Sequence, residues 1–175
     1  MAGLKIANII FRGLQFLWTL LVMALVGNMI SEAIQGNPAT VNYIMFTAAF
    51  AMLTLLYLIP ATCTDKLVGH PIIMLVLDIL NTLFFFCAAI ALPSKLRVHS
   101  CSSKSYTESN SITNGGWNPE KRCREAQAIT AFLWFGFAAF LASLIITAFN
   151  MRKTGADTRG RSRRPSQGAP PMAQV

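Results

Sequence analysis

Apolar residues in this chain are gathered into four blocks rather than spaced along amphipathic helices. Each block has about 18 to 24 residues, close to the length that an α-helix needs to cross a hydrocarbon core about 30 Å thick. The pattern predicts four membrane-spanning helices, at about 9–31, 43–60, 72–92 and 126–150. We therefore expect an all-α membrane protein, with a four-helix bundle over residues 1–150.

Turn residues and prolines separate the blocks. The segment Gln35–Pro38 predicts a tight, nearly uncharged turn after the first block. Pro60 is expected to end the second helix and Pro93 the third. Pro71 suits the first turn of a helix, because the amide hydrogen that it lacks would have no partner there.

The long polar segment at 93–125 is enclosed by apolar blocks on both sides. Its Cys101 and Cys123 bracket a stretch rich in Ser, Asn and Gly, which predicts an outer loop. A disulfide between them requires an oxidising compartment, and closing the loop would stabilise it by about 3 kcal/mol in the chain-entropy model. The alternative is two free thiols in a cytosolic loop.

The formal net charge is +8, and 12 of the 15 basic residues lie in the long loop and the C-terminal tail. Beside four membrane spans, this charge indicates lipid headgroups rather than nucleic acid as the partner. Nine basic residues lie in the two termini and the second loop, against six in the other two loops. The positive-inside rule therefore predicts that both termini are cytosolic.

Residues 151–175 are rich in Gly, Pro and Ser and carry one acidic residue, Asp157. We expect a disordered cytosolic tail that is attracted to anionic lipid, by about 1 kcal/mol per basic residue near the surface. Its basic residues are Arg152, Lys153, Arg159, Arg161, Arg163 and Arg164. Ser166 follows an arginine pair and is a candidate phosphorylation site that would weaken this attraction; the alternative is a charged tail without regulation.

Asp78 is an ionisable residue inside the third block, where a charge is costly and faces protein or water. Arg12 and Gln15 share one face of the first predicted helix at a similar depth, so we expect Asp78 to bond one of them. Asn81 lies one turn along and is expected to belong to the same interhelical clamp. The alternatives are a proton- or cation-coupled transport site and a lipid headgroup contact.

The last block contains five small residues that allow close approach of a neighbouring helix. They are Gly136, Ala138, Ala139, Ala142 and Ser143. Ordinary packing within the bundle and an oligomer interface are both compatible with this pattern. Cys87 is expected to be buried, and Cys63 is either S-acylated or an unmodified thiol.

The sequence contains no pattern typical of an enzyme. His70 and His99 lie in loops expected on opposite sides of the membrane, so they cannot form a metal-binding pair. The chain has no Cys-x-x-Cys pair, glycine-rich phosphate loop or nucleophile elbow. We therefore expect no enzymatic activity, no metal and no cofactor.

Several segments closely resemble the fungal non-classical export protein family, which belongs to the four-span MARVEL-domain proteins. The segments are His99–Cys101, Ser105–Tyr106, Glu108–Asn110, Ile112–Thr113, Lys121–Ala128 with Ala131–Leu133, Val41–Tyr43, Leu77–Asn81 and Gln174–Val175. The resemblance covers nearly the whole chain and includes loop spacing. Gly116–Glu120 looks like an insertion relative to the family.

The resemblance implies a multi-pass protein of the fungal plasma membrane, in patches underlain by eisosomes. It further implies links to sphingolipid levels and to unconventional protein export. We therefore expect a non-enzymatic organiser of a membrane microdomain, whose partners are sphingolipid-rich membrane, the anionic cytosolic leaflet, other eisosome or plasma-membrane proteins and a second copy of the chain. The alternative function is a small transporter or channel that uses Asp78.

Overall fold

Five helices make up most of the part of the chain that the structure describes. The computed structural model describes residues 2–34, 36–64, 71–97 and 99–161, and of residues 2, 71 and 153–161 the backbone alone. The helices are α1 (Ala2–Ser31), α2 (Ala39–Cys63), α3 (Pro71–Leu96), the short α4 (Lys104–Ser109) and α5 (Pro119–Arg161). Within these ranges, α1, α2, α3 and α5 are long and apolar enough to cross a membrane.

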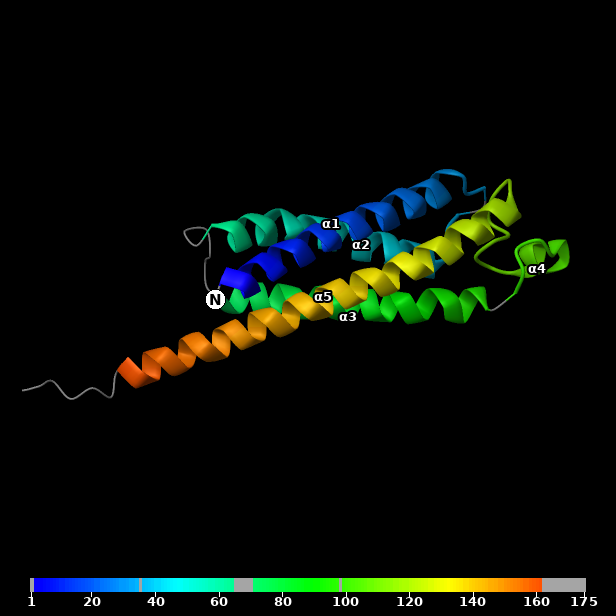
Figure 1. Ribbon diagram of the computed structural model, residues 1–175. Coiled ribbons are helices and arrows are strands. Elements are labelled where there is room, and N and C mark those ends of the chain that lie inside the picture. Colours follow the sequence, from blue (N-terminus) through cyan, green and yellow to red (C-terminus); the bar gives the residue numbers. More distant parts are fainter. Residues whose placement is uncertain (1, 35, 65–70, 98, 162–175) are drawn as a thin grey trace, which may run out of the picture.

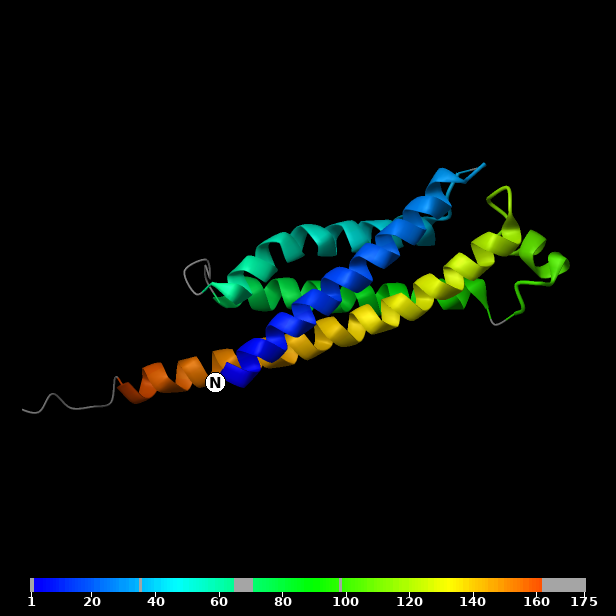
Figure 2. The same cartoon turned by 45° about the horizontal axis from the view of Figure 1, so that its top comes forward.

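The four long helices run up and down along one axis (Figure 1). α5 packs against both α1 and α3, and α2 covers α1 and α3 on the other side. The start of α1 and the end of α5 lie at one end of the bundle, which we call the terminal end; α4 and the α1–α2 turn lie at the other, the loop end (Figures 1 and 2). This is the four-span architecture that the hydropathy blocks predict.

Helix boundaries differ from the sequence prediction at both prolines. α2 continues past Pro60 to Cys63, and α3 continues past Pro93 to Leu96. Each proline lies in the last turn of its helix, and its carbonyl still accepts a bond: Thr64 N donates to Pro60 O at 2.9 Å and Arg97 N to Pro93 O at 2.8 Å. A proline removes its own donor but leaves its acceptor, so the last turn persists.

The outer segment at 93–125 and the tail are also more helical than predicted. α4 forms inside the segment, and α5 begins at Pro119, where proline fits the first helical position. α5 continues to Arg161, so the prediction of a disordered tail from residue 151 is wrong for 151–161. Extending a formed helix adds one hydrogen bond per residue without a new nucleation cost. Residues 162–175 lie outside the described residues.

The interior of the bundle has two halves. Toward the loop end it is apolar, with fully buried residues such as Val26, Ile44, Phe85 and Leu133 in one cluster. Ile112, from the outer segment, is also completely buried and closes this cluster. Toward the terminal end the buried side chains are mostly polar or charged, although α1 and α3 also expose large apolar residues on their outer faces. The polar half is the first candidate site.

Candidate functional site

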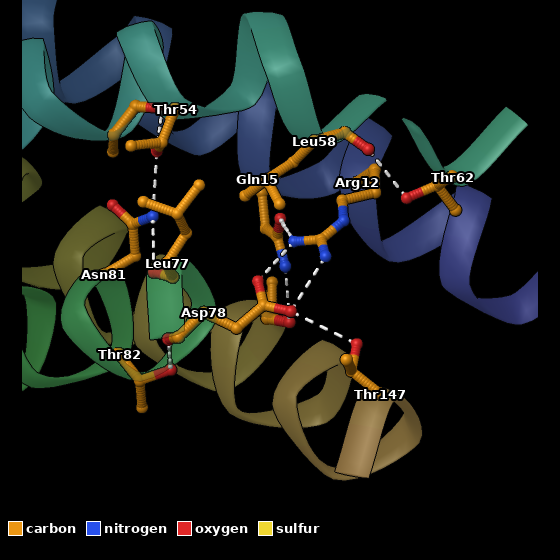
Figure 3. A network of polar contacts seen from close by, with 12 residues as sticks. Arg12, Gln15, Thr54, Leu58, Thr62, Leu77, Asp78, Asn81, Thr82 and Thr147 are labelled. Carbon is orange, nitrogen blue, oxygen red and sulfur yellow. Dashed lines mark hydrogen bonds and ion pairs between the residues drawn. The ribbon is translucent and has the colours of Figure 1, made fainter. Parts of the chain in front are cut away.

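Arg12 of α1 and Asp78 of α3 form an ion pair inside the polar half (Figure 3). Arg12 Nη1 donates to Asp78 Oδ1 at 2.6 Å, and Nη2 donates to Oδ2 at 2.8 Å. Their side chains are 1% and 0% exposed. The planar guanidinium matches the two carboxylate oxygens, which is the geometry in which a buried pair best offsets its desolvation.

Two further side chains connect this pair to α5. Gln15 accepts a bond from Arg12 Nη1 at 3.0 Å and donates from Nε2 to the Ala139 carbonyl at 3.0 Å. Thr147 Oγ1 donates to Asp78 Oδ2 at 3.2 Å. We call this group the arginine–aspartate cluster; it consists of Arg12, Gln15, Asp78 and Thr147. The cluster ties α1, α3 and α5 together, as Figure 3 shows.

Asn81 does not join this cluster, contrary to the sequence prediction. Its Nδ2 donates to Thr54 Oγ1 of α2 at 2.8 Å and to the Leu77 carbonyl at 2.9 Å (Figure 3). Residues three apart on a helix differ by about 60° in direction. That rotation turns Asn81 toward α2, while Asp78 faces α1 and α5.

Several buried polar atoms near the cluster have no protein partner. They are Asn8 Oδ1, Arg12 Nε, Thr19 Oγ1, Asn81 Oδ1 and Ser143 Oγ. By contrast, both carboxylate oxygens of Asp78 are occupied. These three bonds use most of the acceptor capacity of the carboxylate, and all three donors come from neighbouring helices of the bundle.

Arg122 forms a second buried centre at the loop end, which the sequence patterns did not predict. Its side chain is buried, and Nε donates to Ile112 O at 2.8 Å while Nη1 donates to Met29 O at 2.6 Å. Nη2 donates to Asn37 Oδ1 at 3.2 Å. A cation therefore satisfies a carbonyl in the last turn of α1, where the helix dipole favours positive charge.

Glycines make room for this arginine. A Cβ on Gly116 would lie 3.2 Å from the Glu32 carbonyl oxygen and 3.3 Å from Arg122 Nη1. Ile34 N donates to Gly115 O at 2.9 Å, which holds the outer segment against the end of α1. The glycine pair followed by an arginine beside Cys123 is the sequence signal for this centre.

Cys101 and Cys123 form a disulfide, with their Cα atoms 5.6 Å apart. Both residues are buried, and Cys123 is the neighbour of Arg122 on α5. The bond and the arginine therefore fasten the outer segment to the bundle from adjacent positions.

The five small residues of α5 divide between two faces. Gly136, Ala139 and Ser143 are buried, whereas Ala138 is exposed and Ala142 is partly exposed. A Cβ on Gly136 would approach Phe85 Cε1 of α3 to 2.5 Å, so this glycine sets the distance between α3 and α5. The buried members serve packing within the bundle.

The remaining predicted positions lie at the surface or outside the described residues. Cys63 is exposed at the end of α2. Cys87 is also exposed, so the prediction that it is buried is wrong; its position on α3 points outward between the buried Phe85 and Ala88.

Among the tail residues, Arg152 is exposed, and the backbone of Lys153, Arg159 and Arg161 is helical. Arg163, Arg164, Ser166 and His70 lie outside the described residues. Within the described ranges, no group of three or more His, Cys, Asp or Glu side chains is arranged to hold a metal ion.

Four apolar helices that enclose a buried ion pair, with a disulfide-closed segment at one end, define a multi-pass α-helical membrane protein. The family model for the MARVEL membrane-associating domain matches residues 5–146. The chain is 37% identical to non-classical export protein 2 of Saccharomyces cerevisiae, over 98% of this chain and 99% of that protein.

Two further relatives extend the comparison. The chain is 34% identical to non-classical export protein 102 of Candida albicans, over 98% of this chain and 99% of that protein. It is 28% identical to the non-classical export protein 2 homolog of Schizosaccharomyces pombe, over 80% of this chain and 75% of that protein. No solved structure matches. The chain belongs to the fungal non-classical export protein family of MARVEL-domain membrane proteins.

Proposed function

We propose that this protein is a non-enzymatic organiser of a plasma-membrane microdomain, associated with eisosomes and responsive to sphingolipid. In that role it arranges lipids and other membrane proteins and supports unconventional export. The family membership supports the export role, since the relatives carry export in their names. The proposed eisosome association and response to sphingolipid rest on the resemblance of the sequence to proteins of the eisosome compartment.

The observation that carries a structural role is that both oxygens of Asp78 already accept bonds from within the bundle. Both of its oxygens accept bonds from Arg12 or Thr147, so the buried charge links α3 to α1 and α5. The outer faces of the spans instead present large apolar side chains, such as Leu53, Leu83 and Phe135. A rigid bundle with an apolar exterior interacts through its lipid-facing surfaces.

The two ends of the bundle suit different contacts. We place both termini in the cytosol, where the basic residues after Asn150 face the anionic leaflet. The disulfide-closed segment then lies on the oxidising side. Ala138 and Ala142 on the outer face of α5 are the positions at which a second copy would approach most closely.

Imaging in living fungal cells tests this proposal. The full-length protein, fluorescently tagged at its N-terminus, is followed before and after sphingolipid synthesis is blocked. We expect stable cortical patches that disperse on inhibition. A uniform or internal signal that the inhibitor does not change would contradict the microdomain assignment.

A small transporter or channel is the second candidate function. The buried unpartnered atoms of Asn8, Thr19 and Ser143 favour it, because polar groups of this kind are often satisfied by internal water. In that case Asp78→Asn abolishes ion or solute flux in vesicles that contain the purified protein. Under the organiser proposal, neither the wild type nor the variant carries flux above protein-free vesicles.

A further inference from the structure

A cavity of about 490 Å³ lies at the loop end, between the last turn of α3 and α4. Eight residues line it, and none of them carries a carboxylate. They include three basic side chains, Lys95, Arg97 and His99, and three serines, Ser94, Ser109 and Ser111; the other two are Tyr106 and Asn110. Such a set of donors, with positive charge and no negative charge, is typical of an anion site.

In the part of the chain that the structure describes, the basic residues of this cavity have no acidic partners. Among the described residues, neither Lys95 nor Arg97 forms an ion pair. A second cavity, beside α1 and α5 at the same end, provides a contrast. There Lys121 Nζ lies 2.5 Å from Glu32 Oε1, and Arg124 Nη2 lies 2.5 Å from Glu120 Oε1. Positive charge at the loop end is therefore left uncompensated at the first cavity.

Basic residues also gather at helix C-termini simply to satisfy the last carbonyls. At the end of α3, other side chains already donate to these carbonyls. Tyr106 Oη donates to the Leu96 carbonyl, and Asn110 Nδ2 donates to the Lys95 carbonyl at 2.9 Å. The capped carbonyls leave the Lys95 and Arg97 side chains available to an external anion.

The backbone at Arg97 ends α3. Arg97 has φ 57°, in the left-handed region, a common conformation of the residue that follows a helix. Its N–H donates to the Pro93 carbonyl at 2.8 Å, so the backbone of Arg97 caps the helix while its side chain lines the cavity.

An apolar track on α3 leads to the cavity. Leu83, Phe86 and Ile90 are exposed, and they recur at intervals of three and four residues on one face of the helix. Continuing that face by four residues reaches Ser94, which lines the cavity. A molecule held there by its polar end would lay an apolar chain along this track.

We propose that this cavity binds the phosphate group of a phospholipid from the leaflet around the loop end. The Arg97 fork and the Lys95 ammonium bond the phosphate oxygens, the serine hydroxyls add neutral donors, and the acyl chains follow the α3 track. The site stands on its own lining residues, so it can fail while the proposed organiser function holds, and the reverse.

Native mass spectrometry of the purified full-length protein tests the site, with dioleoyl phosphatidic acid as the probe. The double variant Lys95→Gln/Arg97→Gln should bind the probe about tenfold more weakly, since two charge-assisted bonds are lost. Lys104→Gln/Arg124→Gln is the matched control. It removes two exposed charges from the same end outside the cavity and should bind like the wild type. Equal loss in both double variants would overturn the proposal in favour of general charge attraction.

Three further measurements complete the test. The charge-conserving swap Lys95→Arg/Arg97→Lys should retain binding, and its failure together with an intact disulfide and thermal stability would contradict the role of charge. Cholesteryl hemisuccinate, an anionic lipid without phosphate, should bind weakly; tight binding would overturn phosphate selectivity. Inorganic phosphate should displace the phosphatidic acid probe poorly. If it competes as strongly as the lipid headgroup, the lipid source is overturned and free phosphate is the ligand.

Discussion

The carboxyl group of Asp78 receives hydrogen bonds from α1 and α5 while it belongs to α3. Among the described residues, the bundle contains two buried arginines, one toward each end, and they have different kinds of partner. Arg12 is neutralised by a carboxylate, whereas Arg122 bonds two carbonyls and one amide oxygen. At the residue scale, the first arrangement depends on charge balance and the second on the fixed directions of the guanidinium donors.

Asp78→Asn should destabilise the bundle by about 3–5 kcal/mol, because it leaves the Arg12 guanidinium buried without a counter-charge. The double variant Arg12→Met/Asp78→Leu removes both charges and should be markedly more stable than the single one. Thermal unfolding of the detergent-solubilised protein, followed by tryptophan fluorescence, measures both. A single variant as stable as the wild type would show that the pair contributes little.

Stability should also fall at high pH through Tyr106. Burial raises the pKa of this phenol above its ordinary value, and the charge of nearby Arg97 opposes the shift. Because the folded-state pKa of Tyr106 is raised, its contribution to the free energy of unfolding is complete below about pH 10. This contribution is lost as the pH rises through the folded-state pKa.

Tyr106→Phe should remove the alkaline component and cost about 1 kcal/mol at neutral pH through the lost bond to the Leu96 carbonyl. The readout is the melting temperature between about pH 8 and 11. Tyr57→Phe serves as the control. An unchanged alkaline slope in Tyr106→Phe would rule out this residue as its source.

At the element scale, α5 organises the fold. It contacts α1 and α3 along their lengths, carries Arg122 and Cys123 at its start, and continues beyond the span to Arg161. Its small buried residues allow this contact. The hydropathy pattern predicts the span but not the length of the helix, because the composition of residues 151–161 is polar while the backbone keeps adding helical hydrogen bonds.

Gly136→Ala tests the close contact between α5 and α3. The added methyl group would lie 2.5 Å from Phe85 Cε1, so Phe85 or the helix must move, at a cost of about 1–3 kcal/mol. Gly13→Ala on α1 meets nothing within 4 Å and is the matched control. We expect a lower melting temperature only for Gly136→Ala; equal values for the two variants would show that Phe85 yields freely.

At the scale of the whole molecule, the bundle is asymmetric along its axis. The terminal end is joined by buried polar contacts, and the loop end is joined by an apolar cluster, Arg122 and a disulfide. The start of α1 and the end of α5 lie at the same end of the bundle (Figure 1). The membrane orientation that we propose follows from basic residues and the disulfide.

Site-directed labelling in intact cells tests that orientation. In a background without Cys63 and Cys87, Ser103→Cys at the loop end should react with a membrane-impermeant maleimide, whereas Ser166→Cys should react only after permeabilisation. Ser103 is exposed, so access does not require unfolding. The reverse labelling pattern would place the termini outside and contradict the orientation.

By itself, the sequence determined the number of spans and their approximate positions, because span length and hydropathy are local properties of the chain. The resemblance of its loop segments to the fungal non-classical export proteins predicted the family. The sequence also predicted that Asp78 bonds Arg12 or Gln15, since an intramembrane charge needs a partner at the same depth, and the structure shows that the partner is Arg12. Only the tertiary structure decided the partner of Asn81, the burial of Arg122 and the exposure of Cys87. Those outcomes depend on how each helix is rotated about its axis and on which chain segments fold back against it.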